Sequence, residues 1–147
     1  ERVEGARVLD LFAGTGAMGI EALSRGASWA EFVESDATRS RQLRESLSEL
    51  DVTDVTHVNR RDSLKALDIV EGAYDLVFID PPYESDPWGG LMVRLASGLI
   101  LNEDASVVAE HRHDRELSRQ YGRLTHVESR RYGDTSVSFY AAGAQDG

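Results

Sequence analysis

The sequence predicts an α/β domain with a doubly wound, mostly parallel sheet of seven strands and a C-terminal antiparallel hairpin strand. Short apolar runs alternate with segments of helical periodicity, a pattern that favours parallel βαβ units with helices on both faces. Residues 74–80 form an almost continuous apolar run, as expected for a strand buried on both faces. Gly133-Asp134 joins the last two β-rich segments and predicts the hairpin.

Local signals set the bounds of the elements. Gly26 closes the first helix, Asp36 caps the second, and Leu43 and Leu47 lie at helical spacing within the second. We expect strands at residues 7–12, 29–34, 55–59, 74–80, 106–110, 124–132 and 135–141, and helices at residues 17–25, 36–50, 63–69, 88–98 and 115–121. Ligands of such sheets bind beyond the carboxyl ends of the strands, so we expect the site in the loops there.

The length of 147 residues fits one domain. We expect this domain to cover residues 1–142 and a flexible tail to cover residues 143–147. Only six residues precede the first predicted strand, and the chain begins with Glu1 rather than Met, so we expect native sequence upstream.

Composition excludes several classes of protein. The net charge of −10 argues against a surface that attracts nucleic acid or anionic membrane as a whole, but it leaves room for a small basic site. The absence of cysteine excludes disulfides, cysteine-bound zinc, iron–sulfur clusters and thiol catalysis. No apolar run approaches the ~20 residues of a membrane helix, and no signal peptide opens the chain, so we expect a cytoplasmic protein.

A glycine-rich loop follows the first predicted strand. Gly14, Gly16 and Gly19 fit the pattern G-x-G-x-x-G, and Glu34 lies 20 residues after Gly14, where a carboxylate can bind the hydroxyls of an adenosine ribose. This pattern fits dinucleotides and S-adenosylmethionine alike; the alternative is a tight turn with a packing glycine. Asp10 favours S-adenosylmethionine, because a carboxylate there suits its cationic amino-acid end and repels a pyrophosphate.

A further carboxylate, Asp62, follows the third predicted strand. It can accept a hydrogen bond from an adenine amino group, or it can cap the helix that begins at Ser63, and the two roles are compatible.

The most informative tetrapeptide is Asp80-Pro81-Pro82-Tyr83, directly after the fourth predicted strand. Two prolines remove two N–H donors and fix the backbone, which leaves a rigid loop that mainly accepts hydrogen bonds. Asp80 and the Pro81 carbonyl can accept from an exocyclic amine and orient its nitrogen toward a methyl group. Tyr83 offers a face on which a base can stack. The alternative is a turn that ends the strand and carries a surface tyrosine.

These segments resemble those of Rossmann-like class I methyltransferases that use S-adenosylmethionine to modify exocyclic amines. Residues 10–27 together with residues 32–36 resemble, more narrowly, the RsmD family, which methylates guanine N2 in small-subunit (16S) rRNA. The resemblance implies that Gly14 and Gly16 line the cofactor, that Glu34 binds its ribose, and that Asp80 and Tyr83 hold the target base. It implies cofactor contacts at Asp10, Phe12, Ala13, Ser35, Asp62 and Ser63, and a substrate contact at Pro82. Family members also carry a basic segment before the first strand that is implicated in RNA contact.

The remaining signals are weaker. Residues 110–132 carry six arginines against four acids, so we expect an RNA-binding edge that includes Arg130 and Arg131. His111 and His113 have no nearby third ligand, so we expect no metal. The expected partner is 16S rRNA or an assembling small subunit, bound by a monomer. The alternatives are a methyltransferase for adenine N6 or a protein amide, a nicotinamide-dependent oxidoreductase, and a catalytically silent cofactor-binding domain.

Overall fold

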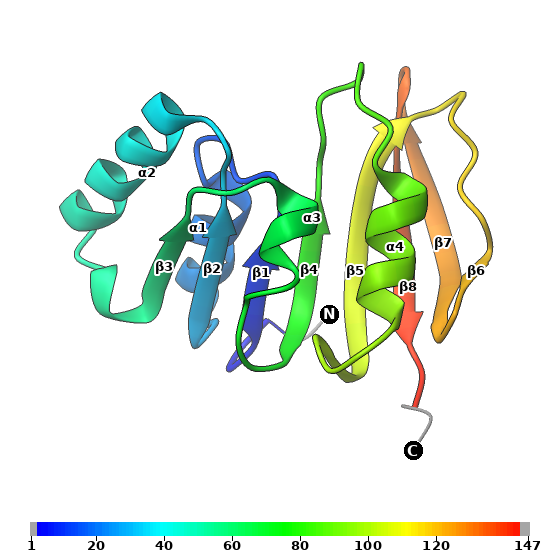
Figure 1. Ribbon diagram of the computed structural model, residues 1–147, viewed down its shortest axis with the longest axis horizontal. Helices are drawn as coiled ribbons and strands as arrows, with labels where there is room; N and C mark the ends of the chain where they lie inside the picture. The colour runs from blue at the N-terminus through cyan, green and yellow to red at the C-terminus, as the bar shows by residue number, and fades with distance from the viewer. Residues whose placement is uncertain (1–2, 145–147) are drawn as a thin grey trace.

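A mixed sheet with the strand order β3-β2-β1-β4-β5-β8-β7-β6 runs through the computed structural model, which describes residues 3–144 (Figure 1). Strands β1 to β5 pair in parallel, and β6, β7 and β8 pair antiparallel. The strands are β1 (Arg7–Asp10), β2 (Trp29–Val33), β3 (Thr56–Asn59), β4 (Tyr74–Ile79), β5 (Leu101–Arg112), β6 (Gln120–Tyr121), β7 (Leu124–Tyr132) and β8 (Thr135–Ala142). The predicted fold class and the C-terminal hairpin are confirmed.

Helices pack on both faces of this sheet. They are α1 (Ala17–Ser24), α2 (Ala37–Glu49), α3 (Ser63–Ala66) and α4 (Trp88–Ala96), with a short 3-10 turn at Thr53–Val55. Leu91 and Leu95 of α4 pack into one buried cluster, and Leu43 and Leu47 of α2 pack into the cluster on the opposite face. Figure 1 accordingly shows α3 and α4 in front of the sheet and α1 behind it.

The prediction of a helix at residues 115–121 is wrong. Gln120 and Tyr121 instead form β6, which raises the strand count over residues 3–144 from the predicted seven to eight. They pair with the start of β7 around a turn at Gly122, whose φ of 57° lies in the left-handed region. The Tyr121 ring packs against Tyr140 of β8 at 5.8 Å between centroids, a contact at long sequence separation that local periodicity does not report.

Among the other elements, the bounds differ most from prediction at the third helix and at β5. The third helix ends at Ala66 rather than at residue 69, and β5 extends from Leu101 to Arg112, well beyond the predicted residues 106–110. The longer β5 has a consequence for the site, since its added residues His111 and Arg112 lie alongside the loop that follows β4. Of the predicted tail, residues 145–147 lie outside the described part of the chain.

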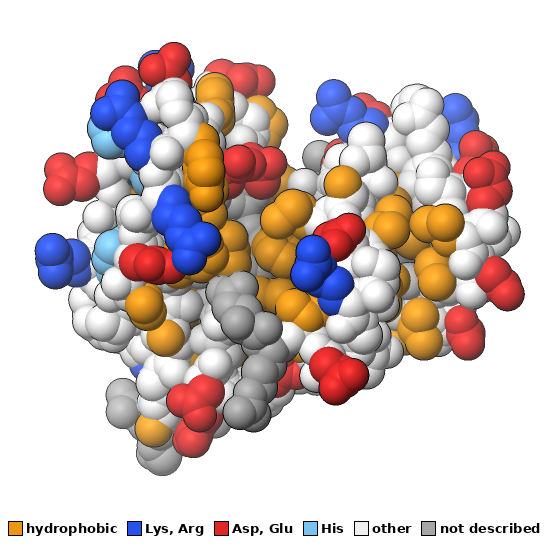
Figure 2. Space-filling view, turned by 180° about the vertical axis from the view of Figure 1, so that it is seen from behind, with side chains coloured by type: hydrophobic (Ala, Val, Ile, Leu, Met, Phe, Trp, Pro, Cys, Tyr) orange, Lys and Arg blue, Asp and Glu red, His pale blue; other side chains and the backbone are white. Residues whose placement is uncertain are grey.

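The chain reverses its direction of travel across the sheet between β1 and β4, which pair in parallel with Asp10 beside Phe78. The loops after these two strands therefore leave the same edge of the sheet on either side of a topological switch point, where such folds bind ligands. The face opposite that of Figure 1 is hollowed between two parts of the surface, and hydrophobic side chains line the hollow (Figure 2).

Candidate active site at the carboxyl edge of the sheet

A cavity of about 850 Å³ opens at the switch point. Its volume is in the range of small-molecule sites. It joins the glycine loop after β1, the end of β2, the loop after β4, and the adjoining parts of β5 and β8. Of the predicted site residues, it is lined by Asp10, Phe12, Ala13, Gly14, Glu34, Ser35, Asp80, Pro81, Pro82 and Tyr83. The structure therefore brings predicted residues from three separate segments of the sequence into one cavity.

Glu34 is fixed at the cavity wall by the backbone. Its Oε1 accepts a hydrogen bond from the Gly14 N–H at 2.8 Å, and its Oε2 accepts one from the Asp36 N–H at 2.9 Å. Gly14 has a φ of 55°, and a Cβ added there would point into open space. Together these contacts hold a carboxylate beside an open stretch of backbone, an arrangement suited to an adenosine ribose.

Gly16 has a different role from Gly14. A Cβ at Gly16 would lie 2.4 Å from Cδ1 of Leu43, so this glycine lets α1 approach α2 closely. Gly16 is not among the residues that line the cavity. The packing explanation, which the sequence left open for this loop, therefore applies at Gly16, while Gly14 faces the cavity.

Asp10 is a buried carboxyl, with only 3% of its surface exposed. Burial raises its pKa to about 7; a hydrogen bond from the Phe12 N–H opposes this shift, and the charge of Glu34 adds to it. An anion at this position is poorly compensated by the protein alone, and a cation bound in the cavity would stabilise it. The electrostatics thus fit the cationic end of S-adenosylmethionine.

Asp62 and Ser63 are not among the residues that line this cavity. The Asp62 carboxylate accepts a hydrogen bond from the Leu64 N–H at 3.2 Å and caps α3, while Ser63 is buried at the start of that helix. The capping role of Asp62 is confirmed. Its contact with an adenine stays a prediction.

The loop after β4 places a second carboxyl at the cavity. Asp80 follows the register pair Ile79–Ala109 of β4 and β5, so it lies beside Glu110. Asp80 is exposed as a residue, but its carboxyl is partly buried. The pKa of Asp80 is raised to about 7, first by this burial and then by the interaction with Glu110 and the charge of Asp10.

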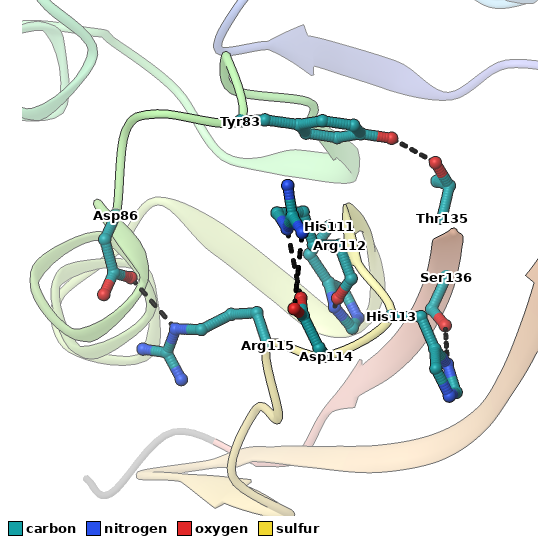
Figure 3. A network of polar contacts seen from close by, with 9 residues as sticks. All are labelled: Tyr83, Asp86, His111, Arg112, His113, Asp114, Arg115, Thr135 and Ser136. Carbon is teal, nitrogen blue, oxygen red and sulfur yellow. Dashed lines mark hydrogen bonds and ion pairs between the residues drawn. The ribbon is translucent and has the colours of Figure 1, made fainter.

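Tyr83 is held from two sides although 48% of its surface is exposed. Its hydroxyl is hydrogen-bonded to Thr135 at the start of β8, and the Arg112 guanidinium lies 5.9 Å from its ring centroid (Figure 3). Arg112 is in turn fixed by Asp114, to which its Nε and Nη2 donate at 3.0 and 3.3 Å. The ring is thereby positioned at the cavity mouth before any base arrives.

A smaller cavity of about 280 Å³ lies on the other side of the same loop. The two cavities share Pro81, Pro82, Tyr83, Ser85 and Glu110. Glu110 and Thr135 were not predicted from the sequence. Glu110 could have been predicted as a site residue, because it is a carboxylate at the end of a predicted strand. No feature of the sequence around Thr135 indicates a role in the site.

Arg130 and Arg131 line neither cavity. Arg130 donates to Glu128 at 3.0 Å and lies over the Phe139 ring, and Arg131 donates to the Gly133 carbonyl at 2.8 Å. Arg130 pairs in register with Val137, which does line the larger cavity. The two arginines therefore stand one strand away from the cavity mouth.

None of the helices described within residues 3–144 is long and apolar enough to cross a membrane. Over the same residues, no group of three or more histidine or acidic side chains is placed to hold a metal ion.

Three features define the class of protein: the sheet order, the glycine loop beside the carboxylates of Asp10 and Glu34, and the loop of hydrogen-bond acceptors after β4. They are those of a Rossmann-like, S-adenosylmethionine-dependent methyltransferase. The chain belongs to the family described as "Conserved hypothetical protein 95", whose model matches residues 1–141. The predicted relationship to the RsmD family is confirmed by this match and by the relatives of the chain.

Three relatives illustrate the similarity. "Putative rRNA methyltransferase YlbH" of Bacillus subtilis is 36% identical over 140 residues, which cover 93% of this chain and 76% of that protein. "Ribosomal RNA small subunit methyltransferase D" of Escherichia coli is 40% identical over 78 residues, which cover 53% of this chain but only 39% of that protein. A solved structure of a conserved hypothetical protein from Streptococcus pyogenes is 31% identical, with a TM-score of 0.87 over 95% of this chain and 87% of that one.

Proposed function

We propose that this protein transfers a methyl group from S-adenosylmethionine to the exocyclic N2 amine of a guanine in small-subunit (16S) rRNA. The observation that carries the proposal is a shared cavity: the acceptor-rich loop at Asp80 faces the same space as Asp10 and Glu34. The names of the relatives from B. subtilis and E. coli, which specify rRNA and the small ribosomal subunit, support the choice of substrate.

The cofactor fits the part of the cavity near β1 and β2. Glu34, already fixed by two backbone N–H groups, would accept from the ribose hydroxyls, and Asp10 would face the cationic amino-acid end. Phe12, Ala13 and Ser35 would complete this wall. When bound, S-adenosylmethionine supplies an electrophilic methyl group on a cationic sulfur. The protein supplies orientation and charge, which are the usual sources of catalysis when no strong base is required.

Asp80 and the Pro81 carbonyl act on the nucleophile. The lone pair of a base amine is delocalised into the ring, so the free amine is a poor nucleophile. Two acceptors that bind its two N–H groups favour a pyramidal nitrogen with its lone pair aimed at the methyl group. As the nitrogen–carbon bond forms and the sulfur–carbon bond breaks, the nitrogen becomes cationic, and the ionised Asp80 carboxylate then accepts one of its protons.

The base must be unpaired or flipped out of its helix to enter the cavity. Tyr83 would stack on it, because Thr135 and Arg112 hold the ring at the cavity mouth. Arg130 and Arg131, one strand away, would contact the flanking backbone of the RNA. We propose that a cytoplasmic monomer performs this reaction on 16S rRNA or on an assembling small subunit.

The test is to incubate the protein with labelled S-adenosylmethionine and with small-subunit rRNA or small subunits, digest the product, and identify the modified nucleoside. We expect N2-methylguanosine. N6-methyladenosine, or a label confined to protein, would overturn the proposed substrate.

Calorimetry with S-adenosylhomocysteine and NAD adds a second criterion. We expect binding of S-adenosylhomocysteine, and a preference for NAD would favour an oxidoreductase. Binding of S-adenosylhomocysteine without transfer to rRNA or subunits would favour a silent binding domain.

A further inference from the structure

Glu110 stands where the two cavities meet. It is one of the residues that line both the 850 Å³ cavity and the 280 Å³ cavity. The parallel register of β4 and β5, with Ile79 beside Ala109, brings it next to Asp80. Glu110 is therefore placed beside any base amine that reaches Asp80.

The cationic side chains around this pair are already paired with other groups of the protein. Pro81 and Pro82 have no N–H group. Three side chains that line the smaller cavity have hydrogen-bond partners within the protein: Arg112 donates to Asp114, Arg115 donates to Asp86 at 3.1 Å, and His111 is hydrogen-bonded to Ser138 at 2.7 Å and to the Arg112 carbonyl at 2.9 Å (Figure 3 shows the two arginine pairs). Asp80 and Glu110 lie side by side at the larger cavity, where their carboxylate oxygens can accept hydrogen bonds from a ligand.

Guanine and adenine differ at the edge that such a pair would meet. The edge of guanine next to its amine donates from N1–H as well as from the amine. Adenine has an unprotonated N1 beside its amine, and this nitrogen accepts. An ionised carboxylate only accepts, so it binds the guanine edge and repels the adenine N1 lone pair. A site built to accept a substrate N–H rejects analogues that lack it, because its own polar group is then left unpaired.

We propose that Glu110 selects guanine over adenine by accepting a hydrogen bond from guanine N1–H, while Asp80 and the Pro81 carbonyl hold the 2-amino group. The inference rests on the proposed transfer to guanine N2 and assigns its specificity to one side chain. Glu110 is thus a specificity-determining contact of the target base, distinct from Asp80, which holds the amine that reacts.

The test compares two nucleotides on three proteins. Guanosine 5′-monophosphate and the 5′-monophosphate of 2-aminopurine riboside both carry the 2-amino group, but 2-aminopurine has no N1–H. Binding is measured by calorimetry and by 2-aminopurine fluorescence with saturating S-adenosylhomocysteine present. The proteins are the parent chain, Glu110→Gln, and Glu103→Gln as a matched control, since Glu103 is an exposed residue of the same strand that lines neither cavity.

We expect the parent chain and Glu103→Gln to prefer the guanine nucleotide by ~10-fold or more, as for a hydrogen bond to a charged group. We expect Glu110→Gln to lose most of this preference because its affinity for the guanine nucleotide falls, while its affinity for the 2-aminopurine nucleotide does not. Unchanged affinity for S-adenosylhomocysteine and an unchanged melting temperature would verify that the variant is folded.

The inference would be overturned if the parent chain did not bind the guanine nucleotide, or if its affinity for this nucleotide were no higher than that of Glu110→Gln. This result is separate from the proposed function, which fails only if the parent chain forms no N2-methylguanosine. If N2-methylguanosine forms and the nucleotide preference survives in Glu110→Gln, the function stands and the role of Glu110 is wrong.

Discussion

The two sides of the cavity are built in different ways. The cofactor side, formed by Asp10, Gly14 and Glu34, is assembled within 25 residues of sequence and held by backbone N–H groups. The amine side, formed by the Asp80–Tyr83 loop, is held by side chains that come from β5 and β8, and the Tyr83–Thr135 contact spans 52 residues. A local loop thus builds one wall, and distant strands must meet to build the other.

Burial follows the same division. Asp10 and Glu34 are almost fully covered, whereas Asp80 and Tyr83 are exposed at the cavity mouth. A small cofactor can be enclosed by a rigid, buried wall. A base attached to a large RNA needs an open one. We therefore expect substitutions on the amine side to change transfer without changing stability, and substitutions on the cofactor side to change both.

The variant Asp80→Ala should best separate an effect on methyl transfer from an effect on cofactor binding. We expect methyl transfer to fall by ~100-fold or more, because a preorganised acceptor of the reacting amine is lost. The affinity for S-adenosylhomocysteine should stay within about twofold, since its site lies toward β1 and β2. Single-turnover transfer and calorimetry measure the two quantities, with Glu49→Ala on the far end of α2 as the control. Full transfer activity in Asp80→Ala would remove this residue from the mechanism.

The second expected effect is a dependence of transfer on pH. Asp80 must be ionised to accept from the amine, and burial together with Glu110 and Asp10 raises its pKa to about 7. The rate constant of transfer should therefore fall ~10-fold per pH unit below 7 and level off above it.

The variant Glu110→Gln sharpens this second test. It removes one of the negative charges that face Asp80, so its inflection should move to lower pH. A rate that is flat from pH 5.5 to 8.5 would contradict a role for Asp80 as the ionised acceptor.

This division also explains which parts of the site could be predicted. The spacing of Gly14 and Glu34 lies within one βα unit, and the acceptors of the Asp80 loop are consecutive, so both were found from the sequence. Glu110 and Thr135 enter the site only through the pairing of β4 with β5 and of β5 with β8, which no local spacing encodes. Gly16 and Asp62 fit two roles by residue type: the structure shows packing at Gly16 and capping at Asp62, and their contacts with the cofactor stay predictions.

On the cofactor side, Asp10→Asn should stabilise the free protein while weakening cofactor binding. Burial raises the Asp10 pKa from 3.8 to about 7. Between about pH 4 and 7 the folded state keeps a proton that the unfolded state has lost, so stability falls as the pH rises through this window, and the full cost is present above pH 7. At pH 8 we expect the neutral variant to gain roughly 2–4 kcal/mol of unfolding free energy.

Thermal or urea unfolding at pH 5 and pH 8 measures this gain, which should be largest at pH 8. Calorimetry should show S-adenosylmethionine bound less tightly by Asp10→Asn, because its cationic end loses a counter-charge. An equal loss of stability at both pH values would mean that Asp10 is an ordinary packing position and would weaken the contrast between the two sides.

The smallest expected effect comes from the contacts that hold Tyr83. Tyr83→Phe removes the hydroxyl that bonds Thr135 but keeps the stacking face, and Thr135→Val removes the partner. Each should raise the KM for RNA by a few-fold and leave kcat nearly unchanged, because the ring gains freedom at an exposed position but still stacks. Combining the two should add little, since both remove the same hydrogen bond. Tyr83→Ala, which also removes the stacking face, should lower kcat/KM by ~10-fold or more. If Tyr83→Phe lowered kcat/KM as much as Tyr83→Ala, the hydroxyl itself would contact the RNA. The amine side would then depend on a fixed polar contact, as the cofactor side does.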